Sequence, residues 1–356
     1  MSDGIRCMVM RGGTSKGLYF LRSDLPSDVA ARDELLMRIM GTPDRRQIDG
    51  LGGAHPLTSK VAVVDRCSHG TAEVDYLFLQ LGVDEALVAD RQNCGNLLSG
   101  VAPFAIEREL IAAAGGEASV RIHMLNSDAH ATATFAVRDG LPVYEGETAI
   151  SGVPGSAAPI QLAFDGTAGG FSGALLPTGN ALDVVHGVAV TMVDNGMPVV
   201  VIRASDVGIS GYETCAELEA DGALRSRLEE IRLAAGPLMN LGDVADTTIP
   251  KMTMIASPKN GGAMATRTFI PHRCHQAIGV LGAVSVATGG LIPGSVAESI
   301  IEHDPASPVV TLEHPTGTFD AIVTLAMAEG GPSVEQAGIV RTARKLMDGF
   351  AFPRAS

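Results

Sequence analysis

The chain has 356 residues, with 26 Lys and Arg against 40 Asp and Glu, so its formal net charge is −14. That charge repels nucleic acid and anionic membranes, and we expect neither as a partner. Hydrophobic residues make up 46% of the chain and charged residues 19%, which excludes a disordered protein. The length favours two domains, and the 42 Gly and 19 Pro are typical of many tight turns between strands.

The sequence favours a cytoplasmic protein. Its first residues lack the apolar core of a signal peptide. The long uncharged stretch 277–297 is interrupted by glycines and by Pro293, so it reads as a buried helix running into a turn. The five cysteines are widely spaced, without a Cys-x-x-Cys pair, and indicate free thiols in a reducing compartment.

Short β-branched runs between turn residues predict strands of mostly antiparallel sheets. In chain order these runs are 61–64, 74–81, 120–124, 199–202, 309–312 and 321–325. Helices are predicted over 28–40, where one face is apolar, and over 215–235, where Gly222 is a candidate break.

Two further segments, 93–114 and 272–291, are apolar nearly all round, as buried helices are. Each has a cysteine near its start, Cys94 or Cys274, and these lie about half the chain apart. We interpret this as two similar domains, each with strands around one central helix whose N-terminus faces a common cleft. The Gly-rich stretch 166–180 would separate the two domains. Two unrelated core helices are the alternative that spacing alone leaves open.

Cys94 and Lys60 are the candidate acid and base. A helix N-terminus offers partial positive charge and N–H groups, so a cysteine there, between Asn93 and Gly95, can be a reactive thiol beside an anion site. Lys60 stands where a loop enters a buried strand, and burial would let its amine act as a base. The ordinary alternatives are a small buried hydrophobe for the cysteine and a solvated charge for the lysine.

A glycine-rich turn over 11–17 follows an N-terminal strand. Its Gly-x-Ser-x-Gly pattern precedes a strand rather than a helix, which excludes a serine hydrolase. Its spacing excludes a Walker loop, and the chain lacks a dinucleotide-binding fingerprint, so we expect no cofactor. Two hydroxyls, Thr14 and Ser15, and two cations, Arg11 and Lys16, suit a carboxylate; an ordinary surface turn is the alternative.

The segment before the second apolar helix carries His272, Arg273, Cys274 and His275. Three of these side chains could bind zinc, but no second cluster completes such a site, so we expect no metal. At a helix start they are better suited to contacts with an anionic substrate.

Several motifs, in order and nearly end to end, resemble the PrpF-like isomerase family. They are Arg11-Gly-Gly-Thr-Ser-Lys-Gly17, Gln47-Ile-Asp-Gly-Leu-Gly-Gly53, Leu57-Thr-Ser-Lys60, Gln92-Asn-Cys-Gly-Asn96, Leu176-Pro-Thr-Gly-Asn180, Asp194-Asn-Gly-Met-Pro198, Met239-Asn-Leu-Gly-Asp243, Phe269-Ile-Pro-His272 and Arg341-Thr-Ala-Arg-Lys-Leu-Met-Asp348. The segment 123–128 departs from the Asn-Thr-Gly-type turn that this resemblance leads us to expect.

The resemblance implies an α+β, diaminopimelate-epimerase-like fold with two pseudo-symmetric domains and the active site between them. Each domain would be a mostly antiparallel β-barrel-like sheet around a central helix, one over 1–182 with 340–356 and the other over 183–339. The resemblance also implies catalysis without cofactor or metal, in a homodimer.

By the same resemblance, Lys60 and Cys94 are the proton-transfer pair. The residues expected to bind substrate are Arg11, Thr14, Ser15, Lys16, Thr58, Ser59, Asn93, Gly95, Asn96, Met197, His272, Arg273, Cys274 and His275. The implied reaction moves a proton on an unsaturated keto tricarboxylate, 4-oxalomesaconate from gallate or protocatechuate breakdown, by keto–enol tautomerisation or a 1,3-allylic shift. The alternatives are an aconitate or methylitaconate isomerase, a racemase using both Cys94 and Cys274, and a non-catalytic accessory protein of a dehydratase.

Overall fold

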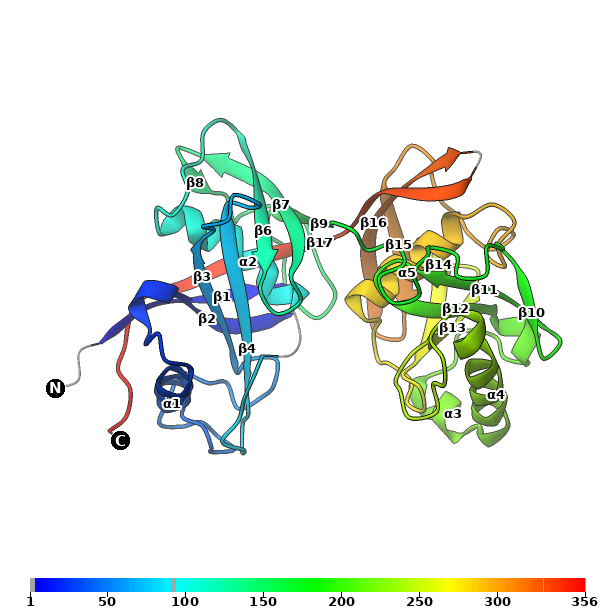
Figure 1. Cartoon of the computed structure of the whole chain (residues 1–356), viewed down its shortest axis with the longest axis horizontal. Coiled ribbons are helices and arrows are strands. Elements are labelled where there is room, and N and C mark those ends of the chain that lie inside the picture. The colour runs from blue at the N-terminus through cyan, green and yellow to red at the C-terminus, as the bar shows by residue number, and fades with distance from the viewer. Residues whose placement is uncertain (1–3, 91–93, 329, 356) are drawn as a thin grey trace. The chain divides into compact units, whose positions relative to one another are not determined.

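The computed structural model describes residues 4–90, 94–328 and 330–355. The chain folds as two compact units (Figure 1): unit 1 is Met1–Asp165 with Val340–Ser356, and unit 2 is Gly166–Ile339. None of the helices among the described residues is long and apolar enough to cross a membrane.

The boundary between the units lies earlier than the predicted 182/183, because residues 166–182 pack with unit 2. The carboxylate of Asp194 accepts hydrogen bonds from the N–H groups of Phe171 and Ser172, each at 2.8 Å. The Gly169 N–H donates to the Asp194 carbonyl, also at 2.8 Å. A buried aspartate of unit 2 therefore holds the glycine-rich segment that was expected to end the first domain.

In its described part, unit 1 is built of strands with two α-helices and one short 3-10 helix. Its elements are β1 (Ile5–Gly12), β2 (Ser15–Leu21), η1 (Arg22–Asp24), α1 (Val29–Met40), β3 (Lys60–Arg66), β4 (Val74–Leu81), β5 (Val88–Ala89), α2 (Gly95–Glu107), β6 (Glu117–Met124), β7 (Ala129–Arg138), β8 (Leu141–Pro142), β9 (Pro159–Phe164) and the second half of β17 (Gly331–Ala351).

Antiparallel hairpins joined by parallel pairs make up the sheet of unit 1. The hairpins are β1–β2, β3–β4 and β6–β7, and the parallel pairs are β2–β3 and β4–β6. The sheet continues from β7 to β9, and β17 pairs with both β9 and β1. The sheet of unit 1 therefore closes on itself, as a β-barrel does.

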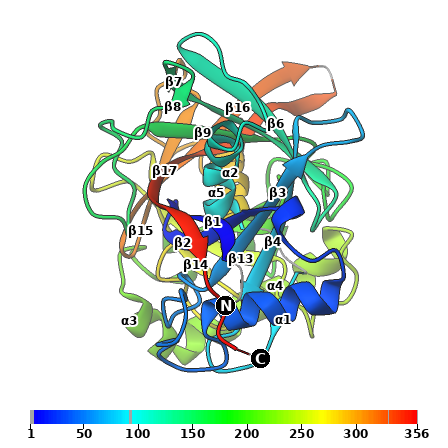
Figure 2. The ribbon, with the colours of Figure 1, turned by 90° about the vertical axis from the view of Figure 1, so that its left-hand side faces the viewer.

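Helix α2 is the central element of unit 1, and every residue from Leu97 to Ile106 is buried. Glycine allows its close approach to the sheet, since a Cβ at Gly12 would stand 2.5 Å from the carbonyl oxygen of Asn96. Helix α1 packs instead across the outer face of the same strands (Figure 2), with Leu36 and Ile39 against Leu18 and Val61. One face of the sheet therefore meets α2 and the other meets α1.

Unit 2 has the same kinds of element. They are β10 (Asp183–Val185), β11 (Val188–Asp194), β12 (Pro198–Arg203), η2 (Ala204–Val207), α3 (Cys215–Ala220), α4 (Gly222–Leu238), β13 (Lys251–Ala256), β14 (Met264–Phe269), α5 (Val280–Leu291), β15 (Val309–His314), β16 (Gly317–Ala328) and the first half of β17.

The strand order of unit 1 recurs in unit 2. The hairpins are β11–β12, β13–β14 and β15–β16, and the parallel pairs are β12–β13 and β14–β15. Helix α5 is buried from Gly282 to Gly290 and follows β14, as α2 follows β4 and β5 in unit 1. Helices α3 and α4 occupy the place in the chain order that α1 has in unit 1. The predicted fold class of two pseudo-symmetric domains, each a sheet around a central helix, is thereby confirmed.

The predicted local elements agree closely with the structure except at the second central helix. Asp28 caps α1 by accepting from the Ala31 N–H, and Asp221 separates α3 from α4 beside the expected break. The helix predicted over 272–291 begins only at Val280, since residues 270–275 turn back on β14: the His275 N–H donates to the Thr268 carbonyl. Cys274 is therefore not at a helix start, which corrects that expectation.

Candidate active site

Lys60 is the first residue of β3 and lies beside Gly17 of the parallel strand β2. Val61 and Val63 pack against α1 on the outer face of the sheet. Because side chains alternate between the two faces of a strand, Lys60 points toward α2. The side chain is only 8% exposed. Its Nζ donates to the Sγ of Cys94 at 3.6 Å and lies 5.0 Å from the centroid of the Phe78 ring. The structure thus brings the two predicted proton-transfer residues into direct contact.

Cys94 is the N-cap residue of α2 and is buried. Its carbonyl accepts the first intrahelical hydrogen bond, from Leu98, so the N–H groups of the three residues between them have no intrahelical acceptor. Those N–H groups and the positive end of the helix dipole lie next to the thiol. The position combines a thiol with a site for negative charge.

Two buried tyrosines that the sequence reading missed hold this helix end in place. The Tyr19 hydroxyl donates to the Leu97 carbonyl at 2.6 Å, and the Tyr76 hydroxyl donates to the Cys94 carbonyl at 3.4 Å. Burial first, and the nearby Cys94 second, raises the pKa of both hydroxyls well above the usual value, so both stay protonated donors. The sequence could have indicated these tyrosines only through their positions on the strand faces that contact α2. Those positions cannot be assigned until the strand register is known.

The glycine-rich turn places Thr14 and Ser15 near the start of α2. Asn96 donates to the Thr14 Oγ1 at 3.1 Å and accepts from the Arg341 Nε at 3.1 Å. Ser15 is 1% exposed, and its hydroxyl has no hydrogen-bond partner among the described residues. Since an unpaired buried hydroxyl is costly, Ser15 is well suited to bind an atom of a ligand.

Thr58 and Ser59 shape the loop that leads into Lys60. Ser59 donates to the Gln47 Oε1 at 2.6 Å, and Thr58 donates to the His55 carbonyl at 3.2 Å. Both hydroxyl hydrogens are thereby used within the protein. Asn93, the remaining predicted residue of this region, lies outside the described residues.

Arg11 and Lys16 are paired across β1 and β2, on the face away from α2, since the intervening Gly12 is the residue that approaches α2. Arg11 Nη1 donates to the carbonyls of Gly13 and Thr342. Burial, and then the neighbouring Arg344, lowers the pKa of Arg11. The structure does not bring Arg11 or Lys16 together with Lys60 and Cys94.

Asn126 belongs to the segment whose sequence departs from the expected turn. Its side chain accepts from the Phe78 N–H at 2.8 Å and donates to the carbonyls of Phe78 and Asp90, at 2.8 and 2.6 Å. Asn126 therefore connects β4, whose Phe78 ring lies under the Lys60 Nζ, to Asp90 in the segment that leads to Cys94.

In unit 2, His272 and Arg273 are exposed and lie near acidic partners, Glu229 at 4.0 Å and Glu219 at 3.9 Å. Cys274 is buried, and burial first and Cys215 second raise the pKa of its thiol, so the neutral form is favoured.

His275 and Met197 make local contacts in unit 2. The His275 Nδ1 accepts from the Ala277 N–H, and burial, with Lys251 nearby, lowers the pKa of this imidazole. The Met197 carbonyl accepts from Ser285 Oγ at 2.7 Å.

Lys251 is the counterpart of Lys60 that the sequence reading missed. It is the first residue of β13 and pairs with Val199 of the parallel strand β12, as Lys60 pairs with Gly17. Burial, and then Arg232, lowers its pKa to about 8, and its Nζ donates to the Thr248 carbonyl at 2.6 Å. The sequence feature that could have indicated Lys251 is the one used for Lys60: a lysine where a loop enters a buried strand.

The duplicated sheet-around-helix fold is an α+β, epimerase-like fold. A hydroxyproline epimerase from Agrobacterium vitis has this fold, with a TM-score of 0.50 at 12% identity over 97% of this chain and 92% of that one. The chain belongs to the PrpF protein family, whose model matches residues 3–353.

Named relatives are similar over nearly the whole length. A (4E)-oxalomesaconate Delta-isomerase from Novosphingobium sp. (strain KA1) is 56% identical over 98% of both chains. A 4-oxalomesaconate tautomerase from Pseudomonas putida is 54% identical over 97% of this chain and 95% of the relative. The crystal structure of a methylitaconate-delta-isomerase has a TM-score of 0.89 at 32% identity, over 98% of this chain and 95% of that one. The chain is an isomerase, and the predicted family and enzyme class are confirmed.

Proposed function

We propose that this chain isomerises 4-oxalomesaconate by moving one proton, as a cofactor-independent, cytoplasmic homodimer in the breakdown of aromatic compounds. Two relatives named for this substrate, at 56% and 54% identity, support the choice of substrate. The observation that carries the mechanism is the 3.6 Å contact between Lys60 Nζ and Cys94 Sγ inside unit 1.

The proposed reaction begins when the neutral amine of Lys60 removes a proton from a carbon made acidic by a conjugated carbonyl. The electron pair left on that carbon spreads into the carbonyl as a dienolate. Cys94 then gives its proton to a second carbon of the dienolate, which leaves a thiolate beside an ammonium. Because these two groups are in contact, one proton passing from nitrogen to sulfur restores the starting state.

The start of α2 supplies the groups that stabilise the negative charge. The N–H groups of Gly95, Asn96 and Leu97 and the helix dipole favour a carboxylate or an enolate oxygen there. The unpaired hydroxyl of Ser15 and the hydroxyl of Thr14 lie at the same end of the helix. Contributions from Met197, His272, Arg273, Cys274 and His275 of unit 2 stay a prediction.

The test is proton NMR of the purified protein with 4-oxalomesaconate in deuterium oxide. We expect deuterium at one specific carbon of the product, and its position distinguishes tautomerisation from the allylic shift. Full-length protein that neither converts 4-oxalomesaconate nor exchanges its protons would contradict the proposal.

A sister activity on methylitaconate is the second candidate, because the methylitaconate-delta-isomerase structure matches this chain with a TM-score of 0.89. The ultraviolet absorbance of the conjugated acid, followed with 4-oxalomesaconate, aconitate and methylitaconate in parallel, separates the candidates. We expect 4-oxalomesaconate to give the highest kcat/KM.

A further inference from the structure

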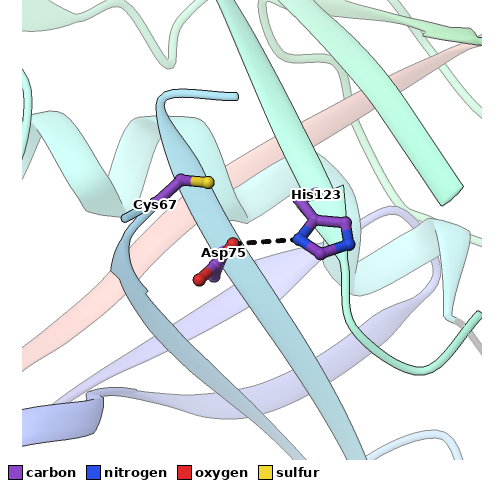
Figure 3. Close-up of side chains that lie close together, drawn as sticks. All are labelled: Cys67, Asp75 and His123. Atoms are coloured by element: carbon purple, nitrogen blue, oxygen red, sulfur yellow. Dashed lines mark hydrogen bonds and ion pairs between the residues drawn. The ribbon is translucent and has the colours of Figure 1, made fainter. Parts of the chain in front are cut away.

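We propose that Cys67, Asp75 and His123 of unit 1 form a binding site for a thiophilic divalent cation of the zinc type. Figure 3 shows the three side chains directed toward one another from the end of β3, from β4 and from β6. Lys60 begins β3 and Cys67 follows its last residue, so about seven residues at roughly 3.3 Å each separate this cluster from the amine. The cluster is thus distinct from the proposed catalytic pair.

The strand register creates the cluster. Asp75 and His123 are paired neighbours on the parallel strands β4 and β6. The Tyr76 hydroxyl reaches Cys94 on the inner side of the sheet, so alternation places Asp75 on the outer side. The N–H of Cys67 donates to the Glu73 carbonyl at 3.0 Å, which fixes the cysteine next to the start of β4.

The spacing of the ligand atoms is close to that of a zinc centre. The Nδ1 of His123 lies 3.1 Å from the Asp75 Oδ1, and the three ligand atoms all lie within 4.8 Å of one another. Bonds of about 2.0–2.3 Å in a tetrahedral site put ligand atoms about 3.3–3.6 Å apart. A small side-chain movement would therefore bring all three onto one ion, with the fourth position left to solvent.

Burial and an outer carboxylate support the assignment. The side chains of Asp75 and His123 are only 11% and 12% exposed. The other imidazole nitrogen, Nε2, lies 2.7 Å from the Asp128 carboxylate, and the ring stacks on His130 with 4.8 Å between centroids. A metal-bound histidine characteristically donates its second N–H to a carboxylate, which orients the ring.

The competing explanation is a protonated His123 held between two aspartates. It accounts for the imidazole but gives no role to the Cys67 thiol, which lies within 4.8 Å of the other two ligand atoms. A divalent ion with one thiolate, one carboxylate and one neutral imidazole is electrically neutral, and sulfur with nitrogen favours zinc over magnesium or calcium. The metal explains all three side chains at once.

Such an ion would join the segment after β3 to β6 and stabilise unit 1 without entering the reaction. Because it binds the folded state, thermal stability should rise with zinc concentration as mass action requires. Turnover should be the same in the metal-free and the zinc-loaded protein.

The experiment is calorimetric titration of the metal-stripped, full-length protein with zinc chloride, repeated on variants. We expect one zinc per chain, with at least tenfold weaker binding in Cys67→Ser and in His123→Gln. Asp128→Asn, which removes only the outer carboxylate, should weaken binding by about 10- to 100-fold. Cys94→Ser is the matched control and should bind zinc like the wild type.

Cobalt provides a second, spectroscopic readout that does not depend on affinity. A thiolate-to-cobalt charge-transfer band should appear in the wild type and in Cys94→Ser and be absent in Cys67→Ser. Absence of saturable zinc binding at one per chain would overturn the proposal. So would zinc affinity that Cys67→Ser leaves unchanged, or a cobalt band that Cys94→Ser abolishes.

Discussion

Units 1 and 2 have the same strand order and a lysine at the same position, yet the two lysines have different partners. In unit 1, Lys60 donates to the thiol of Cys94, the N-cap residue of α2. In unit 2, Lys251 donates to the carbonyl of Thr248, and the N-cap residue of α5 is Gly279, which has no side chain to offer. Within the described residues, the duplicated scaffold therefore brings a strand-initial lysine and a helix N-cap cysteine together in unit 1 and not in unit 2.

Replacing the two lysines in turn is the strongest test of this comparison. Lys60→Met should lower kcat by about 10²–10⁴-fold, the usual contribution of a general base. Lys251→Met should change kcat by less than about tenfold, since that amine donates to the Thr248 carbonyl and not to a thiol. Turnover by absorbance, with substrate binding by calorimetry as a control for folding, measures both. Equal losses in the two variants would show that the units share the chemistry.

Replacing Cys94 and Cys274 in turn should have unequal effects on turnover. Cys94→Ala should lower kcat by about 10²-fold or more, through loss of the proton donor. Cys274→Ala should leave kcat nearly unchanged, because Cys274 lies in the core of unit 2 beside Cys215 and its thiol stays neutral. Substrate should also slow alkylation of Cys94 by iodoacetamide. A large loss of activity in Cys274→Ala would favour a two-cysteine racemase instead.

The central helices of the two units can also be compared through the free energy of unfolding, by placing an alanine at one glycine of each helix. A Cβ at Gly100 of α2 would stand 2.5 Å from the Tyr19 hydroxyl, whereas a Cβ at Gly282 of α5 meets no atom within 4 Å. Gly100→Ala should therefore destabilise the fold by about 1–3 kcal/mol, the usual cost of overpacking. Gly282→Ala should stabilise it by up to about 1 kcal/mol, because alanine favours the helix. Chemical denaturation of both variants measures the difference.

A further difference between the two lysines is a pH dependence of stability from Lys251. Its pKa falls from the ordinary 10.5 to about 8 in the folded protein, so between these values the unfolded chain binds more protons. The free energy of unfolding of the wild type, relative to Lys251→Met, should therefore rise as the pH increases from about 8 to 10.5. A difference that stays flat over this range would show that the amine is well solvated.

Much of the fold and the catalytic candidates could be predicted from local patterns. Asp28 and Gly41 cap α1 as their residue types suggest, and Val74–Leu81 is a strand with the predicted bounds. The candidate pair Lys60 and Cys94 could be proposed because each lies at the start of a buried element. In contrast, the late start of α5 could not be predicted from local pattern, since residues 270–275 directly precede the apolar stretch but return to β14 through long-range backbone contacts, Phe269 with Cys274 and Thr268 with His275.

By itself, the sequence determined the elements, their turns and caps, and the repeated pattern that gives two similar units. These depend on neighbouring residues, whose backbone preferences and periodicity act within a few positions. Only the tertiary structure decided which side chains meet: Lys60 with Cys94, Asp75 with His123, and Arg11 on the face away from α2. Strand register makes these choices, and a shift of one residue would turn each side chain to the opposite face of its sheet.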